Sequence, residues 1–130
     1  MNAMPMQRPQ NRPPSPERIT KMIGDLQAEL AIAKPGDVAL GPDYLRAAIQ
    51  ALRWVLGDPE ARRAPLTDTV LGRAPTLNEI AVEHRVADDV LHGRQPRPHE
   101  RMLSREVVAY EHHLWWAYTG RGAPLDEDDE

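Results

Sequence analysis

Histidine and carboxylate side chains are spread along this chain, and their spacing decides whether they can hold a metal ion. His112 and His113 are neighbours, so on a helix their side chains point about 100° apart and cannot easily share one ion. Glu79, Glu83 and His84 lack the His-x-x-x-His or Glu-x-x-His spacing with which helical bundles bring ligands together. We therefore expect no metal site and no cofactor.

Two further groups of ionisable residues are better explained without a ligand. His84 falls on an apolar stripe and Asp88 follows one helical turn later, so we expect a core histidine paired with Asp88. Residues 126–130 are all acidic but lack the ligand spacing and the turn glycine of an EF-hand loop.

Groups that could act in catalysis form no pattern either. Ser104, Thr67 and Thr69 have no evident base partner, and the chain has no glycine-rich phosphate cradle. Glu106 and Glu111 are expected on a helix surface, in contact with water. We predict that the protein is not an enzyme and find no sign of a small-molecule ligand.

Helical periodicity dominates the segments that carry these residues. Apolar residues recurring every three to four positions predict four main helices, at approximately 16–34, 42–57, 76–92 and 98–119. Ser15-Pro16-Glu17 and the capping box from Thr76 to Glu79 are start signals. Lys34-Pro35-Gly36, Gly57 and Gly93 are stop signals.

The short links predict an all-α fold, a small bundle of two antiparallel hairpins at 16–57 and 76–120. We expect a single helical domain at 15–120, with a flexible proline-rich arm at 1–14 and an acidic tail at 121–130. The loop at 61–75 is expected to be held by Leu66, Val70 and Leu71.

The last predicted helix carries most of the aromatic residues. Its apolar stripe predicts burial of Tyr110, Leu114 and Tyr118, whereas Trp115 and Trp116 lie on opposite flanks of that stripe. Trp54 lies on the flank of the second helix in the same way. Tryptophan is favoured at interface hot spots, but it also closes the edges of small cores. We therefore name Trp54, Trp115 and Trp116 as candidate partner-binding residues, with core closure as the alternative.

The third predicted helix has apolar residues on two sides. Val82, Val86 and Val90 lie opposite its main apolar face, and we include them in the candidate partner surface. The main face is predicted to consist of Leu77, Ile80, Ala81, His84, Ala87 and Leu91.

The same segment, with Thr76-Leu77, Glu79-Ile80-Ala81, Glu83, Val86 and Leu91-His92-Gly93, resembles the DNA-reading helix-turn-helix of the lac-repressor family. The resemblance covers about 18 residues. It would imply a small DNA-associated regulator that contacts phosphates through arginines. Arg85 stands at the turn position that is glycine in that family, which favours a continuous helix instead. The arginines of this alternative are Arg85, Arg94, Arg97, Arg101 and Arg105.

The composition narrows the class of protein. The net charge is −4, but the last five residues are all acidic, so the rest of the chain is near neutral and nucleic acid is not the expected partner. The absence of cysteine fits a reducing compartment, and we see no signal peptide and no membrane-spanning run. Arginine outnumbers lysine 14 to 2, which is typical of GC-rich bacteria and their phages. We predict a cytoplasmic assembly or adaptor protein that binds a partner protein or itself as a homo-oligomer.

Overall fold

The computed structural model describes residues 12–33 and 41–122. This part of the chain holds four helices: α1 (Pro16–Ile32), α2 (Pro42–Leu56), α3 (Leu77–Leu91) and α4 (Ser104–Thr119). Its extended pairing is limited to an isolated antiparallel bridge between Arg63 and Val70. The predicted all-α class is confirmed. None of the described helices is long and apolar enough to cross a membrane.

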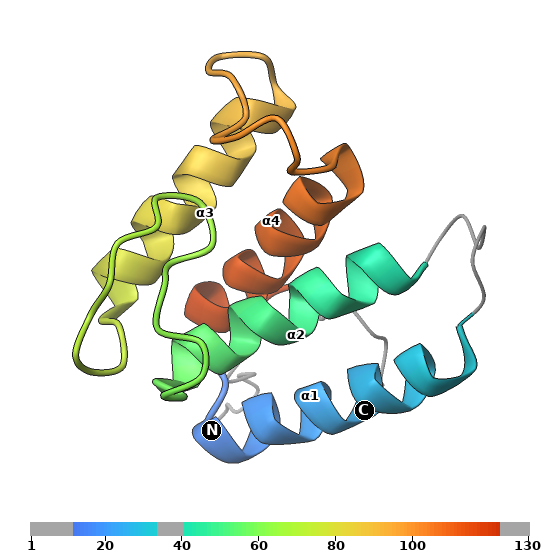
Figure 1. Cartoon of the computed structure of the whole chain (residues 1–130). Helices are drawn as coiled ribbons and strands as arrows, with labels where there is room; N and C mark the ends of the chain where they lie inside the picture. Colours follow the sequence, from blue (N-terminus) through green and yellow to red (C-terminus); the bar gives the residue numbers. More distant parts are fainter. Residues whose placement is uncertain (1–11, 34–40, 123–130) are drawn as a thin grey trace, which may run out of the picture.

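The helices pack as two antiparallel pairs, α1 with α2 and α3 with α4 (Figure 1). Extensive contact between α2 and α4 joins the two pairs. The 61–75 loop runs from the end of α2 along α3 before that helix begins (Figure 1). This arrangement places α2 and α4 at the centre of the bundle, with α1 and α3 on the outside.

The predicted starts of α1 and α3 depend on local capping and are confirmed. The Ser15 hydroxyl accepts a 3.2 Å hydrogen bond from the backbone N–H of Arg18. Thr76 accepts from the N–H of Glu79, and the Glu79 carboxylate accepts in return from the N–H of Thr76. Gly57 ends α2 in the left-handed conformation, as its position predicted.

Two helix boundaries differ from the prediction. The helix α1 ends at Ile32, and the expected stop signal at 34–36 lies outside the described residues. The helix α4 begins at Ser104 and not near residue 98. The Arg97 guanidinium donates to the carbonyl of Met102 at 2.7 Å, and Glu106 accepts from the N–H of Leu103 at 2.7 Å. These bonds hold residues 98–103 as turns and cap the helix later than expected.

The core is formed by the facing sides of all four helices. Tyr110 and Leu114 are buried as predicted, whereas Tyr118 is only partly buried. The apolar residues of α1 pack against α2 within the chain. The largest fully buried side chains are Trp116, Leu26, Leu45, Leu52, Leu114, His113 and Val107.

The buried face of α3 is rotated away from the predicted one. Ile80, Glu83 and Ala87 are buried, whereas Leu77 and Leu91 are 52% and 38% exposed. Apolar periodicity alone missed this rotation, because the buried face includes a carboxylate. Glu83 fits there because three donors from the 61–75 loop meet it.

Those donors attach the loop to α3. The carboxylate of Glu83 accepts from the N–H groups of Leu66 and Thr67 at 2.8 and 3.0 Å, and from the Thr67 hydroxyl at 2.6 Å. Leu66 is buried and Leu71 partly buried, as expected. We expected Val70 to help hold the loop, but its side chain is 55% exposed. Hydrogen bonds to Glu83 attach the loop to α3 in place of a third buried apolar side chain.

Residues 12–14, which we assigned to the N-terminal arm, lie against the end of α4. Pro14 is buried, and the carbonyl of Arg12 sits directly over the α-carbon of Gly120. The remainder of the arm, residues 1–11, and the acidic tail beyond Gly122 lie outside the described residues.

Candidate functional site

A wide surface groove lies beside α3, where that helix meets α4. Its volume is about 890 Å³. Val82 and Ala81 supply its apolar part, and His84 and Tyr118 lie where the two helices meet. The charged residues Arg85, Asp88, Asp89 and Arg94 also line it.

His84 is held by α4 and not by Asp88. Its Nε2 lies 2.8 Å from Oε2 of Glu111, and its Nδ1 lies 3.4 Å from the hydroxyl of Tyr118. Because a carboxylate accepts, Nε2 donates to Glu111, and Nδ1 pairs with the Tyr118 hydroxyl. The expected pairing with Asp88 is wrong, and so is the expectation that Glu111 is simply solvated. His84 thus pairs with Glu111 of the helix packed against α3, and not with Asp88 one turn away in its own helix.

Two aromatic rings complete this cluster. The ring centroid of Trp115 lies 5.1 Å from that of His84 and 5.6 Å from that of Tyr118. The Trp115 and Tyr118 rings meet edge to face at 89°. These contacts restrict the rotamers of all three side chains, so the cluster presents a fixed surface.

The chemistry of the cluster favours recognition over catalysis. Both ring nitrogens of His84 are engaged within the chain, which leaves no free base at this position. Burial, and then the charge of Asp88, raise the pKa of Tyr118, so its hydroxyl stays protonated at neutral pH and acts as a hydrogen-bond donor.

Ion pairs fix most of the charges at the far end of the groove. Arg94 donates to Asp89 at 2.7 Å and to Asp88 at 2.9 Å. His92 lies 3.3 Å from Asp88. Arg85 is exposed and has no ion-pair partner in the described part of the chain. Arg85 is therefore the cation of this groove that is available to a partner.

The three tryptophans occupy different environments. Trp54 and Trp116 are 2% and 1% exposed and belong to the core, so the core-closure alternative describes them and neither offers surface to a partner. The apolar stripes predicted that both tryptophans lie at the edge of a buried face. They are buried because neighbouring elements cover α2 and α4 on more than one side. Trp115 is partly buried in the His84 cluster.

The three valines of α3 also differ in how exposed their side chains are. Val82 is 54% exposed and lines the groove, as expected of a partner-binding residue. Val86 and Val90 are partly buried against the core and do not share this surface. The rotation of α3 toward Glu83 brings them inward.

The helix-turn-helix alternative requires a turn at Arg85. The helix α3 continues without a break through Arg85, so the turn that the resemblance implied is absent from it. Three of the five arginines have partners: Arg94 as above, Arg97 at the Met102 carbonyl, and Arg105 at Asp43 at 3.2 Å. Arg85 and Arg101 are exposed.

Within residues 12–33 and 41–122, no group of three or more histidine, aspartate or glutamate side chains is placed to hold a metal ion. Comparison with protein-family models, curated proteins and solved structures found no match to this chain. The site is therefore interpreted from its own geometry.

Sequence reasoning missed two buried polar residues. Glu83 lies three residues after Ile80 and four before Ala87, so its spacing already placed it on the buried face. His113 is fully buried, lies against the ring of Tyr44 and donates from Nδ1 to the carbonyl of Ala109 at 2.8 Å. Spacing could have flagged both, but only their partners show why burial is tolerated.

Proposed function

We propose that this protein is a non-enzymatic interaction module whose α3/α4 groove binds a protein partner, either a second copy of the chain or another protein. The observation that carries the proposal is that His84 is already paired at both nitrogens while apolar Val82 beside it stays exposed. Such a surface is preorganised and partly apolar, and preorganisation lowers the entropic cost of association.

The side chains along the groove suit a protein surface. Val82 and Ala81 give an apolar centre, and Arg85 beside it is a cation with no ion-pair partner among the described residues. Tyrosine, tryptophan and arginine are favoured at interface hot spots, and Tyr118, Trp115 and Arg85 lie in or beside this groove. The proposed partner therefore presents an apolar side chain next to an acidic one.

The proposed setting is the cytoplasm of a bacterium or an assembly of one of its phages. The arginine bias and the absence of cysteine support this setting.

Site-specific photo-crosslinking tests the proposal in the organism that makes the protein. A photoreactive amino acid replaces Val82 in the groove, and a matched variant carries it at Thr20, an exposed position on α1. We expect a discrete crosslinked product at position 82 that is absent at position 20. Arg85→Glu, placed in the position-82 background, should reduce the yield of that product.

Sedimentation of the purified protein separates the two kinds of partner. A dimer that dissociates on Val82→Asp substitution identifies a second copy, whereas a monomer that still crosslinks at position 82 identifies another protein. A monomer with equal crosslinking at positions 82 and 20 would contradict the proposal.

A further inference from the structure

A small cavity lies between the 61–75 loop and α3, and we refer to it as the loop cavity. Its volume is about 160 Å³, and the apolar part of its wall consists of Trp54, Ala64, Leu71 and Val82. An engineered cavity of about 150 Å³ with apolar walls binds benzene. The loop cavity therefore has room for a ligand of about that size.

The polar part of the wall is already hydrogen-bonded within the chain. It consists of Thr67, Thr69, Glu79 and Glu83. The Thr67 hydroxyl donates to Glu83 at 2.6 Å, so the Thr69 hydroxyl, 2.8 Å away, donates to Thr67. The Glu79 carboxylate binds Arg73 through both of its oxygens. The two hydroxyl hydrogens are thus used inside the protein, and a polar ligand gains little from them.

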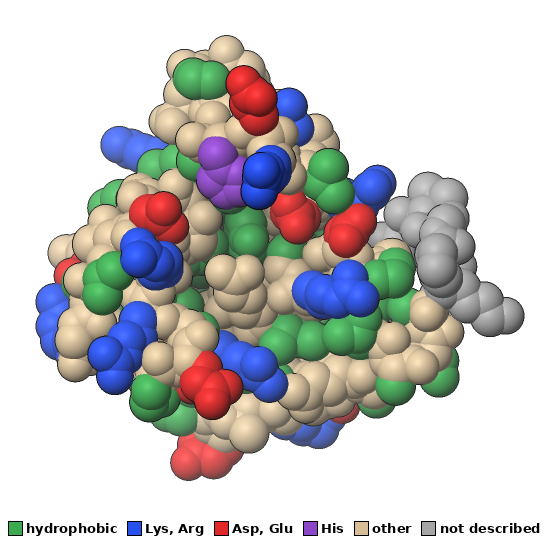
Figure 2. Space-filling view, in the orientation of Figure 1, with side chains coloured by type: hydrophobic (Ala, Val, Ile, Leu, Met, Phe, Trp, Pro, Cys, Tyr) green, Lys and Arg blue, Asp and Glu red, His purple; other side chains and the backbone are tan. Residues whose placement is uncertain are grey.

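The charges around the cavity give an ion no clear advantage. Arg73 offsets the charge of Glu79, and the charge of Glu83 repels an anion. A cation would lose its hydration beside a carboxylate that already accepts from three donors of the loop. Acidic, basic and hydrophobic side chains are interspersed over the surface that the loop and α3 occupy (Figure 2). An uncharged ligand avoids these costs.

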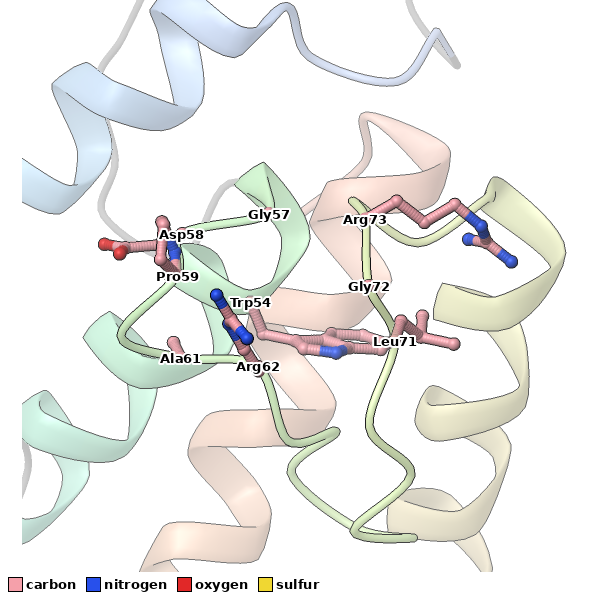
Figure 3. A pocket seen from close by; sticks show the side chains of 9 residues that line it. All are labelled: Trp54, Gly57, Asp58, Pro59, Ala61, Arg62, Leu71, Gly72 and Arg73. Atoms are coloured by element: carbon pink, nitrogen blue, oxygen red, sulfur yellow. The ribbon is translucent and has the colours of Figure 1, made fainter.

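The apolar wall is in place without a ligand. Trp54 is buried, and Figure 3 shows its indole extending from α2 to the arm of the loop that carries Leu71. Val82 is exposed on α3. The hydrogen bonds to Glu83 fix the loop to that helix, so the two sides of the cavity are held together. Binding therefore requires little ordering of the chain.

We infer that the loop cavity binds a small uncharged apolar molecule of about the size of benzene. The ligand lies against Trp54, Leu71 and Val82, and its binding is driven by removal of apolar surface from water. This site is separate from the binding of a protein partner in the α3/α4 groove.

A neighbouring hollow under the same loop has to be told apart from this cavity. Trp54 and Leu71 line both, but the neighbouring hollow carries the charged side chains of Asp58 and Arg62 (Figure 3). Val82 and Thr69 line the loop cavity and not that hollow, whereas Ala61 lines that hollow and not the loop cavity. The methyl groups of these residues therefore report on the two places separately.

Methyl resonances in proton–carbon NMR spectra of the full chain test the inference. The chain is titrated at constant ionic strength with benzene, butyrate or pentylammonium, which have equal numbers of heavy atoms. Single substitutions assign the methyl resonances of Val82, Thr69 and Ala61. We expect benzene to shift those of Val82 and Thr69 saturably, and that of Ala61 much less. Benzene should bind at least about fivefold more tightly than either ion.

The chain provides matched control variants, each followed through the Thr69 methyl resonance. Val82→Asp should weaken benzene binding about fivefold, because a charge replaces an apolar contact. Ile32→Asp makes the same kind of change at an exposed apolar residue of α1 and should leave binding unchanged. Arg85→Glu, expected to reduce crosslinking in the α3/α4 groove, should also leave benzene binding unchanged, so the two proposals can fail separately.

Four results would overturn the inference. The first is the lack of a saturable shift at Val82 and Thr69, and the second is a larger shift at Ala61. The third is an ion that binds as tightly as benzene. The fourth is equal benzene binding by the Val82→Asp and Ile32→Asp variants, or a loss of binding in Arg85→Glu, which would place the ligand in the groove.

Discussion

The hydroxyl of Thr67 donates a 2.6 Å hydrogen bond to the buried carboxylate of Glu83, and this contact joins the 61–75 loop to α3. The same carboxylate takes the N–H groups of Leu66 and Thr67. One side chain thus satisfies three donors that a purely apolar helix face would leave unpaired. The attachment of the loop to α3 therefore bears on the stability of the fold.

Replacing Glu83 should destabilise the fold in proportion to the acceptors lost. Glu83→Gln keeps one oxygen for the two N–H groups, and its amide can donate to the Thr67 hydroxyl, so we expect a cost of about 1 kcal/mol in the free energy of unfolding. Glu83→Ala leaves all three donors without an acceptor and should cost about 3 kcal/mol. Urea denaturation measures both, and equal midpoints for the two variants would contradict this role of the carboxylate.

Two glycines with similar backbone angles should respond differently to alanine. Gly93 and Gly120 have φ of +73° and +78°, so a side chain costs about 1 kcal/mol at either position. At Gly93 an added Cβ meets no other atom within 4 Å, whereas at Gly120 it would overlap the carbonyl of Arg12. Gly120→Ala should therefore lower the melting temperature clearly more than Gly93→Ala. Equal shifts would mean that residues 12–14 do not pack there in solution.

The adjacent tryptophans of α4 should differ in their contribution to stability. Trp116 is fully buried, with the guanidinium of Arg18 5.8 Å from its ring, so Trp116→Ala should cost about 3–5 kcal/mol in the free energy of unfolding. Trp115 is only partly buried and should cost about 1–2 kcal/mol when truncated. Denaturation followed by far-ultraviolet circular dichroism gives both values. A larger effect at Trp115 would reverse their assignment to groove and core.

His113 should make the protein less stable in mild acid. Burial lowers its pKa from 6.5 to about 4, so the unfolded chain takes up a proton over a pH range in which the folded chain does not. The stabilisation from neutral His113 is present above pH 6.5 and is lost as the pH falls toward 4. Between pH 7 and pH 5 this loss amounts to about 2 kcal/mol.

The matched variant for this effect is His113→Leu, which removes the titrating ring and keeps an apolar side chain in the core. The wild type should lose more stability than this variant on going from pH 7 to pH 5. A His99→Gln variant, at an exposed position before α4, should behave like the wild type. If all three proteins lost the same stability, a group other than His113 would be responsible.

Features that depend on a few consecutive residues were predictable. The Ser15 cap, the Thr76–Glu79 capping box and the Gly57 stop each act within one helical turn, and all three are present as predicted. The late start of α4 was missed, because it depends on the bond from Arg97 to the Met102 carbonyl rather than on apolar spacing.

The candidate site was only partly predictable. Val82 could be placed on an outward face from its helical position alone. The link between His84 and Glu111 could not, because residues 27 positions apart meet only after α3 packs on α4. The nearer Asp88 was the reasonable partner within one helix, but it pairs with His92 and Arg94 instead.

By itself the sequence determined four amphipathic helices and their caps, since periodicity and capping act over a few residues. The tertiary structure decided which side of each helix is buried, because that depends on what the neighbouring elements present. Trp54 and Trp116 became core residues when a second helix or the loop covered their flanks. Glu83 became a core residue because three loop donors needed an acceptor, and Val82 was left exposed on the opposite side of α3.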